Sequence, residues 1–265
     1  MMELRIELEK QLNDFNPEIR HGAFETLLGQ LRDGTIALPD QGPFFNMHCH
    51  SFFSYNGYGY SPLGLAWRGR AEGLYAMGLV DFDVLDGADE FLGACQALGL
   101  RTCAGFETRI FVPEFADREI NSPGEPGISY HMGAGMVAAV PDEGALIHEL
   151  KAIARRRNRS MTDRINAHLS EAALDYDAEV LPLTPKGNAT ERHVCIAYDQ
   201  KVQALFPDIE ARAAYWSVKL GSPLETVRAA MEDPPVFQGL IRAKLMKSGG
   251  VGYVAPEGPD FPQLG

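Results

Sequence analysis

The sequence predicts an α/β protein in which a helical segment precedes a parallel sheet. Apolar side chains recur at helical spacing between residues 3 and 34, and short apolar runs then alternate with longer amphipathic stretches. The lengths of chain between the apolar runs suit βα crossover connections, which favour parallel strands. Periodicity alone leaves open whether such a sheet closes into a barrel.

Residues 1–40 are expected to form an N-terminal helical extension. Leu4 and Leu12 belong to a first apolar pattern, and Pro17 is typical of the first turn of a second helix. Gly34 and the segment IALPDQGP then predict a loop. We therefore expect a domain boundary near residue 40.

Residues 41–265 are expected to form one α/β domain. A loop rich in Pro and Gly, EFADREINSPGEPG, interrupts it, and a turn with a short strand is expected at 176–183. The expected strands cover 44–47, 78–84, 101–104 and 128–140, and the expected helices cover 62–77, 87–98, 142–171 and 189–206, with two more reaching residue 247.

The charge of the chain limits its partners. The formal net charge is −12, so the surface as a whole repels a phosphate backbone, which argues against a broad nucleic-acid interface. The basic run at 155–159 is therefore expected to be a solvated helix face. A small phosphorylated ligand stays compatible with this charge, because metal ions in a pocket reverse the local field.

The cysteines and the N-terminus predict a cytoplasmic protein. The four cysteines form no CxxC pair and no zinc-finger spacing, so reduced thiols are expected. The segment MMELRIELEKQLNDF lacks the apolar core of a signal peptide, and no window approaches the roughly 18 apolar residues of a membrane span. The sequence leaves the oligomeric state open.

Three candidate metal ligands follow expected strands. His48 and His50 are two positions apart, so on a strand their imidazoles share a face and reach one cation such as zinc, manganese or iron. Glu107 follows the third strand, where a carboxylate bridges metal ions or orients a water. His131, within the fourth strand, is a further candidate, and a core histidine bonded to backbone is its structural alternative.

A charged segment at 183–194, LTPKGNATERHV, holds further candidates. His193 is a candidate ligand, while Lys186 and Arg192 are candidate contacts for an anionic oxygen, which Arg192 would bind through two nitrogens. The segment also fits the start of a helix, whose free N–H groups favour an anion. A solvated, charged loop is the alternative without function.

Taken in order, these segments resemble the motifs of a known family. HCHSFFSYNG resembles HxHTxxSDG, VDFDVLDG resembles TDHDxxxG, and CAGFE resembles a motif that ends in Gly-x-Glu; the family is PHP (polymerase and histidinol phosphatase). The resemblance runs from about Phe45 to His193. It implies a distorted seven-stranded β/α barrel that holds metal ions at the C-terminal ends of its strands and hydrolyses phosphoesters. The ligands that it implies are His48, His50, Glu107, His131 and His193.

Three departures from that family reduce the expected metal site. Phe82 stands where the second motif has its histidine, and Asn56 stands near the place of the first motif's aspartate. No histidine follows His193, so the family's final Asp-x-His motif is absent, and we expect a barrel truncated at its C-terminus. We expect one or two divalent ions (zinc, manganese or iron) in place of a cluster of three.

The expected function is that of a metal-dependent phosphoesterase-like hydrolase acting on a small phosphorylated molecule. Glu107 would bridge the ions, and Lys186 and Arg192 would neutralise the phosphoryl oxygens. Two alternatives stay open. One is a PHP-like scaffold without catalysis that binds a ligand or regulates, and the other is a metal-dependent amidohydrolase, a class that shares His-x-His on its first strand.

Phe82 distinguishes catalysis from a scaffold role. If Phe82 takes the ligand position, strand alternation turns Asp81 and Asp83 away from the site, and a one-residue bulge would reverse this. On this placement, a Phe82→His substitution is expected to raise metal affinity.

Overall fold

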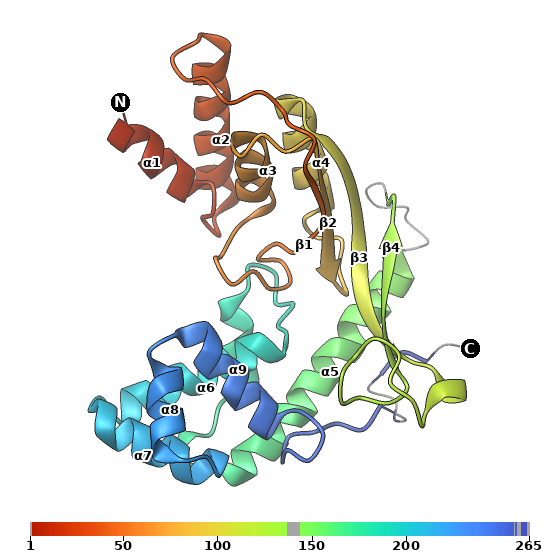
Figure 1. Ribbon diagram of the computed structural model, residues 1–265, viewed down its shortest axis with the longest axis vertical. Helices are drawn as coiled ribbons and strands as arrows, with labels where there is room; N and C mark the ends of the chain where they lie inside the picture. Colours follow the sequence, from red (N-terminus) through yellow and green to blue (C-terminus); the bar gives the residue numbers. More distant parts are fainter. Residues whose placement is uncertain (1, 137–143, 257, 259–260, 264–265) are drawn as a thin grey trace. The chain divides into compact units, whose positions relative to one another are not determined.

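The computed structural model describes residues 2–136, 144–256, 258 and 261–263. The chain forms two compact units (Figure 1). Unit 1 comprises residues 1–108 and 131–148, and unit 2 comprises residues 109–130 and 149–265. The expected boundary between a helical extension and a single barrel domain stays a prediction.

A curled sheet of four strands forms what resembles half of a distorted barrel (Figure 1). Its strands lie in the order β1 (Phe45–Cys49), β2 (Ala76–Phe82), β3 (Arg101–Phe111) and β4 (Ile128–Ala134). β1, β2 and β3 are parallel, which confirms the predicted α/β class. Since the sheet has four strands in the described part of the chain, the seven-stranded barrel stays a prediction.

The helices of unit 1 pack on one face of this sheet. They are α1 (Met2–Gln11), α2 (Pro17–Arg32), α3 (Pro62–Ala71) and α4 (Ala88–Leu98). Asn16 and Ser61 cap α2 and α3 by accepting backbone N–H bonds, and Gly99 ends α4 at a φ of 65°. The apolar sides of the helices share a core with Met77 and Leu79 of β2. Because strand side chains alternate, Phe82 belongs to the opposite face of β2.

Unit 2 is mainly helical, in keeping with the helices expected after residue 142. Its short turns include η1 (Pro113–Phe115) and η2 (Ser170–Ala172). Its helices are α5 (Gly144–His168), α6 (Glu191–Leu205), α7 (Ile209–Leu220), α8 (Leu224–Met231) and α9 (Pro234–Leu245). The first turn of α5 belongs to unit 1. Trp216 and Tyr198 are fully buried in its core. Three helices therefore follow α6, where the sequence predicts two.

Two expected elements differ in the structure. The helix expected to reach Met77 ends at Ala71, because Gly73 turns the chain at a φ of 73° before β2 begins. The short strand expected at 176–183 is wrong. Those residues form a π-helical turn, η3 (Tyr176–Val180), and a 3₁₀ turn, η4 (Leu181–Leu183), and Asp175 caps the first by accepting two backbone N–H bonds.

The basic run at 155–159 is only partly solvated. Arg155 and Arg159 both bind the exposed Asp177 carboxylate, at 3.1 and 2.7 Å. Arg157, in contrast, is buried, and its guanidinium lies 4.6 Å from the centre of the Phe261 ring. The expectation of a uniformly solvated face is wrong because the helix turns this one arginine into the core of unit 2.

All four cysteines are free thiols, as expected. In the described parts of the chain, no helix combines the length and the apolar character that crossing a bilayer requires.

Candidate metal centre

Two histidines and a glutamate converge in unit 1. His48 Nε2 lies 2.9 Å from Glu107 Oε2, and His50 Nε2 lies 3.3 Å from the same oxygen. One ligand atom from each residue lies within 4.8 Å of the other two. His48 is on β1, His50 is the first residue after β1, and Glu107 is on β3. Because β1 and β3 both lie next to β2 in the sheet, these residues come close together.

The electrostatics of the three residues suit a cation. Burial lowers the pKa of His50 to about 4, aided by the charge of His48 and opposed by the nearby Val80 backbone, so His50 is neutral at pH 7. Burial also raises the pKa of Glu107, and the nearby charge of Asp83 raises it further. The charge and the hydrogen bond of His48 lower this pKa, but burial outweighs them. A neutral imidazole is the form that binds metal, and a cation would relieve the cost of the buried Glu107 charge.

Phe82 lies beside His50 and Glu107. Its ring stacks on that of His50, with centroids 4.4 Å apart and planes at 13°, and its register partner on β3 is Glu107. The pairing of β2 with β3 runs from Ala76 to Phe82 without a shift, so the bulge that would turn Asp81 inward is absent there. An aromatic ring thus lies beside the candidate ligands at position 82.

The two aspartates that flank Phe82 have other partners. Asp81 is 1% exposed and binds the turn that follows His50. Asp83 has a left-handed φ of 59°, which ends the strand alternation, and its carboxylate accepts a 2.6 Å hydrogen bond from Thr108 Oγ1. The sequence identified both residues but did not predict these partners.

The Asn56 side chain forms hydrogen bonds with the backbone next to His50. Its Nδ2 donates to the His50 carbonyl at 2.8 Å, and its Oδ1 accepts from the Tyr58 N–H at 2.9 Å. The Asn56 amide therefore restrains the backbone next to His50, a role that the sequence did not predict.

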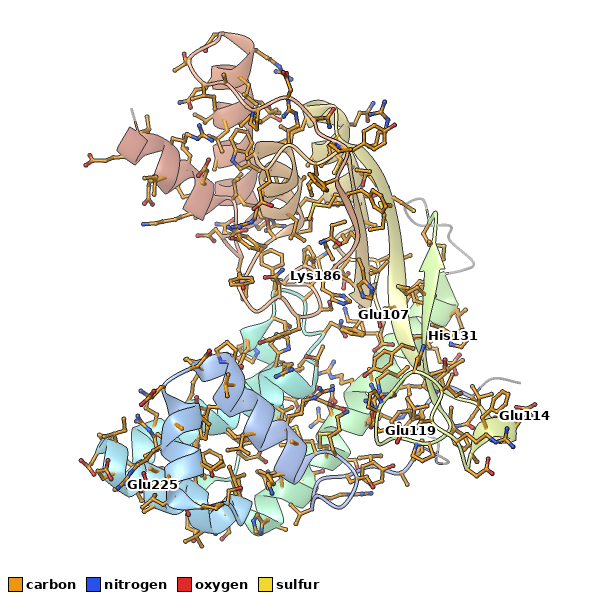
Figure 2. The ribbon with its side chains drawn as sticks, viewed as in Figure 1. Glu107, Glu114, Glu119, His131, Lys186 and Glu225 are labelled. Carbon is orange, nitrogen blue, oxygen red and sulfur yellow. The ribbon has the colours of Figure 1, made fainter. Side chains whose placement is uncertain are left out.

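His131 belongs to unit 1 but lies outside the close group of three. Figure 2 shows Glu107 on β3 and His131 on β4. The His131 side chain is exposed, and its ligand atoms are not within the 4.8 Å group. Its role as a ligand stays a prediction.

The remaining predicted site residues belong to unit 2. His193 is buried near the start of α6, and its Nδ1 accepts the Thr190 N–H at 3.0 Å; burial lowers the His193 pKa to about 4. Lys186 lies in the loop before α6, and Arg192 is the second residue of that helix. The sequence correctly predicted a helix start in this segment, while its role in binding a metal or an anion stays a prediction.

A buried network of ion pairs in unit 2 was not predicted. Arg109 binds Glu125 at 2.6 Å and Glu191 at 2.8 Å. Arg242 binds Glu191 at 2.6 Å, and Lys247 lies 3.2 Å from Glu125 and 3.3 Å from Glu191. These partners are up to 122 residues apart in sequence, so no local sequence pattern predicts their pairing. We call these five residues the ion-pair network.

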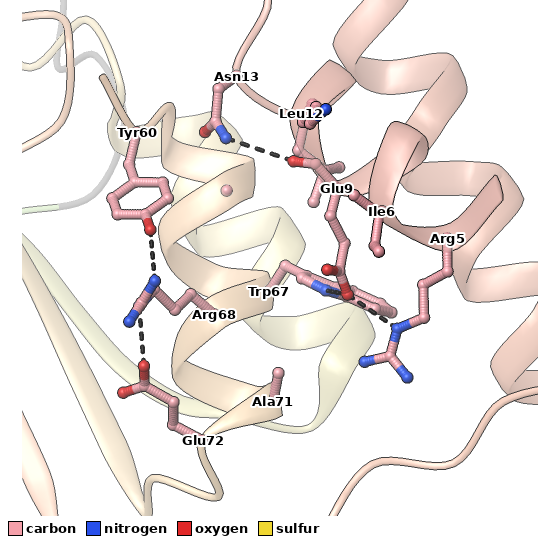
Figure 3. A pocket seen from close by; sticks show the side chains of 12 residues that line it. Arg5, Ile6, Glu9, Leu12, Asn13, Tyr60, Trp67, Arg68, Ala71 and Glu72 are labelled. Atoms are coloured by element: carbon pink, nitrogen blue, oxygen red, sulfur yellow. Dashed lines mark hydrogen bonds and ion pairs between the residues drawn. The ribbon is translucent and has the colours of Figure 1, made fainter. Parts of the chain in front are cut away.

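A hollow of about 460 Å³ between α1 and α3 offers no comparable chemistry (Figure 3). Glu9 accepts hydrogen bonds from Arg5 at 2.9 Å and from the Trp67 indole at 3.0 Å, and Arg68 binds Tyr60 and Glu72. Its charged groups thus pair within each helix, and the hydrogen bond from Trp67 to Glu9 joins α3 to α1.

Comparisons with known proteins give partial likenesses. No family model matches the chain. A stretch of 72 residues is 38% identical to an error-prone DNA polymerase from Cutibacterium acnes, and the match covers 27% of the chain and 6% of the polymerase.

Two solved structures are similar to parts of the chain. An amidohydrolase from Chromobacterium violaceum, with bound sulfate and no metal, has a TM-score of 0.50 and 18% identity, over 79% of this chain and 57% of that one. A proposed metal-dependent phosphoesterase from Bifidobacterium adolescentis has a TM-score of 0.49 and 17% identity, over 68% of this chain and 56% of that one. The chain thus spans little more than half of each structure, and its likeness to the amidohydrolase is one of fold.

Proposed function

We propose that this chain is a metal-dependent hydrolase of phosphoesters, acting on a small phosphorylated molecule. The observation that carries the proposal is the convergence of His48, His50 and Glu107 on one point. Two imidazoles and one carboxylate form a donor set known from catalytic zinc sites and from non-haem iron sites. Such a set leaves coordination positions for a water and a substrate oxygen.

The residues of the centre have separate tasks in this proposal. A bound divalent ion supplies a water of lowered pKa and polarises a phosphoryl oxygen. Glu107 would contribute the negative charge of the donor set. The Phe82 ring fills the space on one side of His50 and so limits how the imidazole can turn.

The other predicted residues enter as part of the proposal. Lys186 and Arg192 stay predicted contacts of an anionic oxygen, and His131 and His193 stay predicted ligands. The ordered PHP-like motifs support this assignment. The 72-residue likeness to a DNA polymerase is in keeping with a family named after polymerases and histidinol phosphatase.

Metal-dependent amidohydrolysis is the second candidate function. The likeness in fold to an amidohydrolase favours it, and His-x-His on the first strand suits both chemistries. The third possibility is a scaffold without catalysis, which Phe82 in the ligand position favours.

Metal content is the first test. The protein, purified and incubated with zinc, manganese and iron, is analysed by inductively coupled plasma mass spectrometry, beside a double variant His48→Ala, His50→Ala. An exposed histidine on α2, His21, provides the control substitution His21→Ala. We expect a stoichiometric metal in the wild type and in the control, and none in the double variant.

Activity then separates the candidate functions. The metal-loaded wild type is assayed against a panel of phosphomonoesters, phosphodiesters and cyclic or linear amides. Turnover of a phosphoester that the double variant lacks supports the proposal, whereas turnover of an amide alone supports the amidohydrolase. A loaded protein that turns over neither class supports the scaffold, and a metal-free wild type contradicts the metal centre itself.

A further inference from the structure

The turn that follows His50 is held by one buried carboxylate. Asp81 Oδ1 accepts hydrogen bonds from the Ser51 N–H at 2.6 Å and from Ser54 Oγ at 2.7 Å. Asp81 Oδ2 accepts a third from Ser51 Oγ at 2.6 Å, and Ser51 Oγ itself accepts the Phe53 N–H at 3.1 Å. Three donors from four consecutive residues thus fix this turn on the end of β2.

Close packing seals this arrangement from solvent. Ser51 and Ser54 are fully buried, and Asp81 is 1% exposed. A Cβ atom added to Gly87 would lie 3.2 Å from Asp81 Oδ2 and 3.0 Å from the Phe53 ring, so no side chain fits there. Since water cannot substitute for a lost donor in such packing, each hydrogen bond determines the geometry of the turn.

Adjacent residues of β2 hold His50 from two sides. Asp81, on the face that the helices cover, binds the backbone and hydroxyl groups directly after His50. Phe82, on the opposite face, stacks on the His50 ring at 4.4 Å. Asn56 adds a hydrogen bond to the His50 carbonyl. The imidazole is therefore restrained through its ring and through the backbone on its C-terminal side.

We propose that Asp81 is a positioning residue for metal binding, which fixes the 51–54 turn so that His50 faces Glu107. Asp81 itself touches no metal, and the inference rests on the proposed function of the centre. Residues that orient metal ligands typically contribute about 10- to 100-fold to metal affinity. The support acts here through the Ser51 N–H and the hydroxyl groups of Ser51 and Ser54, and these hydrogen bonds do not involve the imidazole.

The test compares metal affinity with fold stability in matched variants. Asp81→Asn, Ser51→Ala and Ser54→Ala are titrated with Zn²⁺ against a chromophoric chelator, and their metal-free forms are unfolded in urea. Ser61→Ala is the control, because Ser61 is equally buried in unit 1 but binds the Leu12 carbonyl and the Gly64 N–H. Cobalt absorption spectra report the geometry around the bound ion.

Asp81→Asn and Ser51→Ala are expected to weaken Zn²⁺ binding about 10- to 100-fold and to alter the cobalt spectrum. Ser61→Ala should lower the urea midpoint and leave both metal readouts unchanged. Should Asp81→Asn fail to fold, Ser54→Ala, which loses a single hydroxyl, carries the same expectation of weakened binding.

Wild-type affinity and an unchanged cobalt spectrum in the folded variants would overturn the role of Asp81. The proposed function would survive that result if His48→Ala, His50→Ala still abolished binding. A wild type that binds neither zinc nor cobalt would overturn both.

Discussion

Two buried glutamates, Glu107 in unit 1 and Glu191 in unit 2, differ in what neutralises them. Both are nearly inaccessible, at 5% and 8% exposure. Burial alone would raise the pKa of Glu191, but Arg109, Lys247 and Arg242 together hold it far below its usual value. At Glu107 burial prevails over the influence of His48, and the pKa is raised.

The difference separates a structural carboxylate from a candidate ligand. Arginine and lysine keep their charge at neutral pH, so the ion-pair network satisfies Glu191 permanently. His50 is neutral at pH 7, and a neutral imidazole leaves the charge of Glu107 uncompensated. A buried carboxylate whose ion-pair partners in the described residues are imidazoles is thus suited to receive a cation, whereas one held by arginine and lysine stabilises the fold.

Breaking the ion-pair network should have the largest effect. Arg109→Met removes the cation that joins Glu125 to Glu191 and leaves two buried carboxylates with fewer partners. Losing one member of a buried charge network costs about 3–5 kcal/mol. The free energy of unfolding in urea measures this loss.

The matched control is Arg118→Met in the same unit. Arg118 Nε lies 3.7 Å from Asp117, and both side chains are more than 70% exposed. Exposed pairs contribute at most about 1 kcal/mol. An equally small loss for Arg109→Met would show that the ion-pair network does not stabilise unit 2.

Removing the Glu107 charge should leave the metal-free protein stable and abolish its stabilisation by metal. A ligand at 100 times its Kd stabilises a protein by about 2.7 kcal/mol, and Glu107→Gln should abolish this increment for Zn²⁺. The metal-free variant should be at least as stable as the metal-free wild type, because the fold disfavours the Glu107 charge. Thermal unfolding with and without metal provides both values.

Glu72→Gln is the control for that substitution, since Glu72 is half exposed at the end of α3 and pairs with Arg68. It should keep the full metal increment. A Glu107→Gln protein that metal still stabilises would remove Glu107 from the centre.

A smaller effect should appear in the pH dependence of stability. Burial alone would raise the pKa of Glu125, but Arg109, Lys247 and the Ser122 hydroxyl outweigh it, so the folded pKa is lowered. The stabilisation from this ionised group is therefore fully present above the unfolded pKa, near 4.5, and is lost as pH falls through the folded pKa. Glu125→Gln should be less stable than the wild type at pH 7, and the deficit should shrink toward pH 3. A deficit that stays constant with pH would contradict this linkage.

Most elements of unit 1 could be predicted from the sequence because their signals are local. Pro17 and Pro62 mark helix starts, and the close spacing of His48 and His50 predicts that both imidazoles reach one point, as they do at Glu107. The meeting of these histidines with Glu107 was predicted from the resemblance to the PHP motifs, and the three residues do lie together. Glu107, however, lies within β3, where the sequence predicts a position after the strand.

The remaining interactions depend on packing between distant residues. Asp81 reaches Ser51 across 30 positions, and Arg109 reaches Glu191 across 82. Side chains of Ser and Arg are common in loops and on surfaces, so their types do not reveal a buried partner. The dipeptide pattern Asp81-Phe82 showed that a ligand was missing, but only the strand register shows which residue faces the centre.

The smallest effect concerns Phe82, where two substitutions separate stacking from ligation. Phe82→His keeps an aromatic ring beside His50 and adds a nitrogen donor next to Glu107, its register partner. We expect zinc affinity to rise about tenfold, which corresponds to about 1.4 kcal/mol. Phe82→Leu removes the ring without adding a donor, so it should leave His50 freer to rotate and weaken zinc binding slightly. Competition titrations against a chelator measure both constants. If the two variants bind zinc equally, a histidine at position 82 does not reach the ion, and the second motif is wrongly placed. If the histidine variant alone gains affinity, the centre lacks a single ligand, and β2 is already positioned to supply it.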